Sequence, residues 1–124
     1  MKIVLDPSQF DVLLCGNLFG DIVGDLCTGL VGGPVNAPSI NRSMKEVVFT
    51  VAHGDPRSLV GTGNANPVPL LLSSLYLLEY LNEHAARNRL GAAMEQAVVD
   101  GIRPISLEGQ ASCNAYVQAV LERL

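Results

Sequence analysis

Residues 10–25, FDVLLCGNLFGDIVGD, are the most informative stretch of this chain for its fold class. The apolar run Phe10–Cys15 predicts a short strand that ends at Gly16, and Asp21–Thr28 predicts a helix with an apolar face toward the core. A strand that leads directly into a helix is the repeating unit of α/β proteins. The sequence therefore favours an α/β fold.

Two carboxylates lie one turn apart in the predicted helix. Asp21 and Asp25 are four residues apart, so they share a helix face, where two like charges repel each other unless a cation lies between them. Carboxylate oxygens are the ligands that hard divalent cations prefer. The spacing indicates a divalent metal site, and an ordinary solvated helix face is the alternative for such a pair taken alone.

Length, charge and hydropathy limit the possible partners. The 124 residues fit one domain, and eight basic against twelve acidic residues give a net charge of -4. Nucleic acid needs a broad cationic face, so we expect no nucleic-acid partner. Charges interrupt Met1–Asp6, and polar residues interrupt the apolar run Val68–Leu81, so we expect neither a secretory segment nor a membrane span.

The cysteines indicate a reducing environment. They are odd in number, widely separated and outside any Cys-x-x-Cys spacing: Cys15, Cys27 and Cys113. This pattern is typical of reduced thiols in an intracellular compartment, and it does not fit a disulfide framework or a zinc site.

Further elements follow along the chain. Two loops, one strand and three helices are predicted, in the order Pro34–Ser39 (loop), Glu46–Ala52 (strand), His53–Asn66 (loop), Pro67–Leu81, Arg89–Val99 and Ser112–Leu124 (helices). The helix Pro67–Leu81 is apolar nearly all round, so we expect it to be buried. The long glycine-containing loop His53–Asn66 is the expected ligand surface.

Five short motifs occur in one order along the chain: Pro7–Val12, Asn17–Asp21, Gly29–Gly33, His53–Gly54 and Ala65–Pro67. Together they resemble the metal-dependent β-decarboxylating dehydrogenases, the family of isocitrate and 3-isopropylmalate dehydrogenases. The resemblance spans almost the whole chain but matches only the carboxy-terminal part of a family member. It implies that residues 1–124 are a partial domain, the carboxy-terminal portion of the family's three-layer αβα sandwich.

The resemblance also implies a reaction. Family members oxidise a 2-hydroxy acid by hydride transfer to a nicotinamide, and they then remove the neighbouring carboxylate while Mg²⁺ or Mn²⁺ holds the enolate oxygen. Leu30–Gly33 and Ala37–Ser39 look closer to the NAD-type isocitrate branch, which converts isocitrate to 2-oxoglutarate. By this resemblance Asp21 and Asp25 are the metal ligands.

The loop that follows the predicted strand resembles the cofactor loop of the family. There a His-Gly pair and a later Asn contact the adenosine half of NAD, and these roles fall on His53, Gly54 and Asn66. Asn66 followed by Pro67 is equally typical of a helix N-cap, and the two roles are compatible. A purely structural role is the alternative for His53.

Several residues depart from the family pattern around the nucleotide. Ser58 stands where NAD-using members carry Asp, and Ser58-Leu59 stands where NADP-using members carry Lys-Tyr. Without the Lys the 2′-phosphate of NADP loses its partner, so NAD is favoured, with Arg57 as a possible substitute cation for NADP. The other departures are Thr50, Thr62, Ser106 and Glu108.

The substrate-binding arginines, the catalytic tyrosine and lysine, and a further metal carboxylate from across the family dimer all precede the matching region. We therefore assign no catalytic residue, and we expect that these 124 residues alone do not turn over isocitrate. Two hypotheses follow: part of a catalytic NAD-dependent isocitrate dehydrogenase subunit, or a regulatory or inactive relative. In both, homo- or hetero-oligomeric dehydrogenase subunits are the expected partners. The branch implies the mitochondrial matrix, with the cytoplasm as the alternative.

Overall fold

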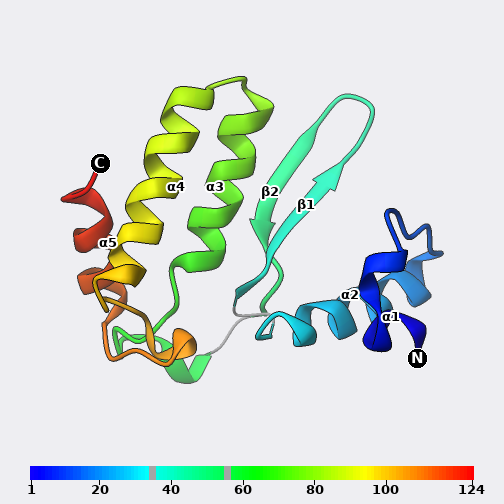
Figure 1. Ribbon diagram of the computed structural model, residues 1–124, viewed down its shortest axis with the longest axis horizontal. Coiled ribbons are helices and arrows are strands. Elements are labelled where there is room, and N and C mark those ends of the chain that lie inside the picture. The colour runs from blue at the N-terminus through cyan, green and yellow to red at the C-terminus, as the bar shows by residue number, and fades with distance from the viewer. Residues whose placement is uncertain (34–35, 55–56) are drawn as a thin grey trace. The chain divides into compact units, whose positions relative to one another are not determined.

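The computed structural model describes residues 1–33, 36–54 and 57–124 (Figure 1). The chain divides into two compact units, Met1–Pro34 and Val35–Leu124, and each is described by itself. Across the described ranges, no helix combines the length and apolar character that a membrane crossing requires.

The first unit is helical. It contains α1 (Lys2–Leu5), the 3₁₀ turn η1 (Pro7–Gln9) and α2 (Asn17–Leu30). The predicted helix is confirmed, although α2 begins before Asp21 and ends after Thr28. The strand predicted over Phe10–Cys15 is wrong, because these residues adopt no strand and none of the described strands lies in this unit to pair with them.

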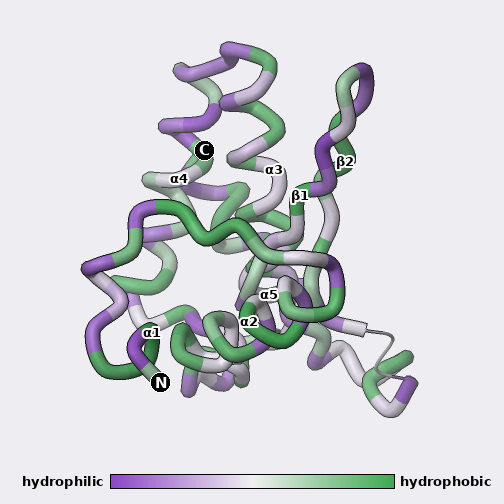
Figure 2. The backbone as a smooth tube through the Cα atoms, turned by 90° about the vertical axis from the view of Figure 1, so that its right-hand side faces the viewer, coloured by the Kyte–Doolittle hydropathy of each residue, from purple (hydrophilic) through white to green (hydrophobic). Residues whose placement is uncertain are grey.

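No residue of α2 is buried, although hydrophobic residues recur along it (Figure 2). Phe19 is 68% exposed, Leu18 is 67% exposed and Ile22 is 57% exposed. An amphipathic helix normally buries its apolar face. The first unit therefore presents apolar side chains that its own described residues do not cover.

The second unit opens with a β-hairpin. β1 (Pro38–Arg42) pairs antiparallel with β2 (Val47–Val51), with Ile40 opposite Phe49. The predicted strand Glu46–Ala52 is confirmed by β2. The predicted loop Pro34–Ser39 is wrong at its end, because Pro38 and Ser39 belong to β1, and residues 34–35 lie outside the described residues. Proline is tolerated as the first residue of a strand, which is its place here.

Three helices complete this unit. α3 (Val68–Tyr80) lies between the hairpin and α4 (His84–Val99), and α4 packs against α5 (Cys113–Leu121) (Figure 1). All three predicted helices are confirmed, with α4 starting earlier than predicted. Together with the hairpin they confirm the α/β class. Their buried apolar residues form one core: Val68, Ala93, Met94, Ala97, Tyr116, Ala119 and Val120.

The predicted burial of α3 on all sides is wrong. Only Val68, Pro69 and Ser73 are buried, whereas Leu70 is 59% exposed and Tyr76 is 50% exposed. The hairpin and α4 cover part of the helix surface, and the remaining apolar side chains face outward.

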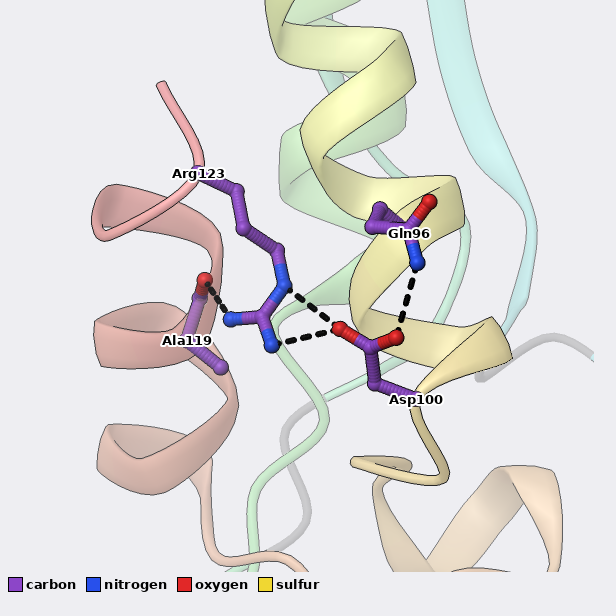
Figure 3. A network of polar contacts seen from close by, with 4 residues as sticks. All are labelled: Gln96, Asp100, Ala119 and Arg123. Carbon is purple, nitrogen blue, oxygen red and sulfur yellow. Dashed lines mark hydrogen bonds and ion pairs between the residues drawn. The ribbon is translucent and has the colours of Figure 1, made fainter.

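A polar network joins the ends of α4 and α5 (Figure 3). Arg123 donates from Nε and Nη2 to Asp100 Oδ2 at 3.0 and 2.6 Å, and from Nη1 to the Ala119 carbonyl at 2.7 Å. Gln96 Nε2 donates to Asp100 Oδ1 at 2.7 Å. The hydrogen bonds from Arg123 and then Gln96 lower the pKa of Asp100. This network fixes the last turn of α5 to the end of α4.

Candidate metal and nucleotide sites

Asp21 and Asp25 both lie on α2, which confirms that they are one turn apart on a single helix. Both side chains are exposed, and no basic side chain of the described chain forms an ion pair with either. Two unpaired carboxylates on one face provide hard oxygen donors for a divalent cation. Within residues 1–33, 36–54 and 57–124, no third histidine, cysteine or carboxylate joins them in a metal-binding group.

Two carboxylates are an incomplete ligand set, and this fits some cations better than others. Zinc sites use four ligands with nitrogen or sulfur among them, whereas Mg²⁺ keeps several waters and is commonly held by one or two carboxylates together with its substrate. The pair therefore fits a Mg²⁺-like ion whose remaining ligands come from water, substrate or another part of a larger protein.

His53 and Gly54 lie just beyond the end of β2. His53 is half-buried, and its Nδ1 lies 2.9 Å from the carbonyl oxygen of Gly54. Since a carbonyl only accepts, this hydrogen bond places the proton on Nδ1, and Nε2 of the neutral ring is then an acceptor. The ring is oriented by its own loop, and in its neutral form it presents an acceptor nitrogen.

The N-cap of α3 is Pro67, so the cap predicted at Asn66 lies one residue too early, although the Asn66 side chain still accepts from the first helical N–H. Its Oδ1 accepts from the backbone N–H of Val68 at 3.0 Å, and its Nδ2 donates to Oδ1 of Asn36 at 3.0 Å. The side chain therefore ties the end of the loop both to α3 and to the segment that precedes β1. An amide oxygen and nitrogen can each take part in more than one hydrogen bond, so a contact with a ligand is compatible with these bonds.

The middle of the same loop is a defined turn. Gly61 and Gly63 have φ of +78° and +73°, values that favour glycine. Thr62 Oγ1 donates to the Leu59 carbonyl at 2.8 Å, and the Gly63 carbonyl accepts from the backbone N–H of Cys113 at 2.8 Å. The first residue of α5 thus anchors the loop. Residues 55–56 lie outside the described residues.

The structure keeps the sequence-predicted residues in two groups. Asp21 and Asp25 belong to the first unit, whereas His53, Gly54 and Asn66 belong to the second. Ser73 was not identified from the sequence. It lies on α3, and its hydroxyl donates to the backbone carbonyl of Thr50 in β2. The only sequence signal for it is a serine within an apolar helix.

The chain matches the family described as isocitrate/isopropylmalate dehydrogenase over residues 1–120. An isocitrate/homoisocitrate dehydrogenase of Thermus thermophilus is 40% identical over 124 residues, covering 100% of this chain and 37% of that protein. The probable alpha subunit of the mitochondrial NAD isocitrate dehydrogenase of Caenorhabditis elegans is 41% identical over 127 residues, covering 100% of this chain and 35% of that protein. The chain therefore spans little more than a third of the length of these relatives.

The chain is also similar to a regulatory subunit. A mitochondrial NAD isocitrate dehydrogenase regulatory subunit of Dictyostelium discoideum is 35% identical over 126 residues, covering 100% of this chain and 36% of that protein. Among solved structures, the isocitrate dehydrogenase of Methylococcus capsulatus superposes with a TM-score of 0.84 at 29% identity, covering 98% of this chain and 37% of that one. This likeness confirms the dehydrogenase-like α/β fold.

Proposed function

The chain belongs to the isocitrate/isopropylmalate dehydrogenase family, and on that premise we propose that it supplies the metal and dinucleotide contacts of an NAD-dependent isocitrate dehydrogenase subunit. In this proposal the reaction is the oxidative decarboxylation of isocitrate to 2-oxoglutarate. The chain contributes binding and orientation, because it spans 35–37% of the length of its relatives.

Asp21 and Asp25 hold the divalent ion in this proposal. Their exposed, unpaired carboxylates on one face of α2 are the observation that carries it. Mg²⁺ or Mn²⁺ bound there supplies a Lewis acid that polarises the substrate carbonyl and stabilises a developing oxyanion. α2 fixes the spacing of the two carboxylates, so that both can reach one ion from the same side.

His53, Gly54 and Asn66 hold the adenosine half of NAD in this proposal. The acceptor Nε2 of His53 suits a donor such as the exocyclic amine of adenine. Apart from Gly54 and its chain neighbours, no described residue has a heavy atom within 4 Å of the place that a Cβ on Gly54 would occupy, so the backbone there can approach a ligand closely. Asn66 fixes the far end of the loop through Val68 and Asn36.

Paramagnetic broadening by Mn²⁺ tests the metal site in the chain as it exists. We expect Mn²⁺ to broaden the backbone amide resonances of α2 around Asp21 and Asp25, because the ion relaxes nearby nuclei even when it binds weakly. Asp21→Asn weakens this effect, whereas the matched variant Asp11→Asn, which removes an exposed carboxylate of the same unit, leaves it unchanged. Equal broadening in both variants would contradict the proposed ligands.

A regulatory role is the second candidate function. The departures at Thr50, Ser58 and Thr62 favour it, as does the similarity to the Dictyostelium discoideum regulatory subunit. A double change, Asp21→Asn with Asp25→Asn, in a complete dehydrogenase polypeptide that carries this region separates the two. Loss of activity with assembly intact supports the catalytic role, whereas unchanged activity of the mixed complex supports the regulatory one.

The proposal includes partners and a location. Relatives of this chain bear the names of subunits of mitochondrial isocitrate dehydrogenases, so we propose homo- or hetero-oligomers with dehydrogenase subunits in the mitochondrial matrix, or in the cytoplasm. The apolar side chains that α2 exposes are a surface suited to such association.

A further inference from the structure

Ser73 is a polar residue in the middle of an apolar helix. Ser73 is 1% exposed, and among the described residues it shares the possession of a buried hydroxyl with the core residue Tyr116. A buried hydroxyl without a hydrogen-bond partner is costly, so such groups are nearly always paired. Here the Ser73 hydroxyl leaves its own helix and donates to the backbone carbonyl of Thr50 in β2.

Thr50 lies three residues before His53, close to the point where β2 ends. The last backbone hydrogen bond of the hairpin joins Ala52 N–H to the Ala37 carbonyl at 3.2 Å. The loop then leaves the sheet. The Ser73 hydroxyl therefore holds the strand immediately before the His-Gly pair.

The other end of the same loop is also fixed to α3. Asn66 Oδ1 accepts from the backbone N–H of Val68, the first residue of that helix. Ser73 lies five residues further along the helix. One helix thus holds both ends of the loop 53–66, the start through Ser73 and the end through Asn66.

We propose that Ser73 is a positioning residue for the dinucleotide: it acts through Thr50 to set the place of His53 and Gly54. This inference rests on the proposed function of the loop. Packing between the hairpin and α3 does not depend on the hydroxyl, because the rings of Phe49 and Tyr80 also join them, with centroids 5.8 Å apart. Ser73→Ala then removes the hydrogen bond while the helix and the hairpin stay together.

The neighbouring residue provides a matched control. Ser74 Oγ donates to the Leu70 carbonyl at 2.9 Å, a bond within α3 itself. Ser74→Ala therefore removes a hydroxyl one position along the same helix without touching β2. The two alanine variants differ in which carbonyl loses its donor.

The test measures NAD affinity and backbone amide shifts in the whole chain. We expect Ser73→Ala to weaken NAD binding about three- to tenfold, the effect of losing one hydrogen bond. The largest amide shifts should fall on residues 51–54, and Mn²⁺ broadening of α2 should stay unchanged. Ser74→Ala should match the wild type in all three. Wild-type NAD affinity and wild-type shifts in Ser73→Ala would overturn the inference.

Absence of NAD binding and failure of the variant to fold can each be distinguished from failure of the inference. If the wild-type chain binds no NAD, the proposed nucleotide role fails, while the shifts at residues 51–54 still show whether Ser73 positions the loop. If Ser73→Ala does not fold, Ser73→Cys, which replaces the hydroxyl with a thiol that is only a weak donor, takes its place. Weakened NAD binding with shifts at residues 51–54 then supports the inference, and wild-type affinity with wild-type shifts contradicts it.

Discussion

Helices α2 and α4 are of similar length, 14 and 16 residues, and they differ sharply in what they bury. α2 is the more apolar in sequence, yet none of its residues is buried. α4 carries several charged residues, yet Ala93, Met94 and Ala97 lie in the core. Burial therefore depends on the surroundings of a helix as much as on its composition. The second unit builds its own core, whereas the first unit presents an apolar surface.

The largest expected contrast is between two aromatic residues. Tyr116 is 1% exposed in the core of the second unit, whereas Phe19 is 68% exposed on α2. We expect Tyr116→Ala to lower the free energy of unfolding by about 3–5 kcal/mol, since it removes a buried ring. We expect Phe19→Ala to change it by about 0.5 kcal/mol or less. Urea unfolding followed by circular dichroism measures both, and equal effects would refute the contrast.

Backbone hydrogen exchange compares the two units directly. Local opening costs least where few apolar contacts hold an element. We therefore expect the backbone amides of α2 to exchange at least about tenfold faster than those of α4, a difference measurable by NMR. Equal protection of the two helices would show that the first unit is held by contacts that its exposed side chains do not reveal.

The exposed apolar surface of α2 predicts self-association. Ile22→Lys places a charge on that surface, so we expect a smaller weight-average mass at high protein concentration in analytical ultracentrifugation. Val99→Lys is the matched control, because Val99 is also an exposed apolar residue, 72% exposed, but at the end of α4. An identical response in the two variants would mean that α2 is not the associating surface.

The smallest effect concerns acid stability of the second unit. The hydrogen bonds from Arg123 and Gln96 hold the pKa of Asp100 below its unfolded value. The stabilisation that the ionised Asp100 gives to the folded state is therefore complete above the unfolded pKa, about 3.9, and is lost as the pH falls through the lower folded pKa. We expect Asp100→Asn to be less stable than the wild type at pH 6, with the difference shrinking toward pH 3. A difference that is constant with pH, measured by urea unfolding, would rule out this carboxylate.

Tyr116 affects the stability of the second unit at alkaline pH, as Asp100 does at acid pH. Burial raises the pKa of its hydroxyl, so the folded state resists ionisation. The contribution of the neutral Tyr116 hydroxyl to folding stability is complete below about pH 10 and is lost as the pH rises through the folded pKa. Absorbance of the tyrosinate ion during alkaline titration measures this, and we expect one of the three tyrosines to ionise late. Three tyrosines that ionise together near pH 10 would contradict it.

Local patterns predicted much of the fold. The apolar spacing predicted α3, α4 and α5, the β-branched run predicted β2, and Asn66-Pro67 placed the start of α3 to within one residue. The strand predicted over Phe10–Cys15 failed because a strand also needs a partner. β1 was missed because its sequence, PSINR, begins at a proline and contains one β-branched residue, whereas β2, VVFTV, is of the same length and rich in them. The spacing of Asp21 and Asp25 follows from the helix alone.

Contacts between distant residues could not be predicted in this way. The bond from Ser73 to Thr50 joins residues 23 positions apart, and the bond from Asn66 to Asn36 joins residues 30 positions apart. Both depend on how α3 packs against the hairpin. The sequence therefore indicated the residues of the loop proposed to bind the dinucleotide, and the structure added what fixes its two ends.

Thermal unfolding of this chain with NAD, with Mn²⁺ and with both measures whether its folded state binds the dinucleotide and the metal. A ligand that binds the native state preferentially raises the unfolding temperature. We predict one cooperative transition of the second unit that moves to higher temperature with NAD, and a separate rise in the unfolding temperature of the first unit with Mn²⁺. A transition that neither ligand moves would contradict the assignment of metal and dinucleotide contacts to this chain.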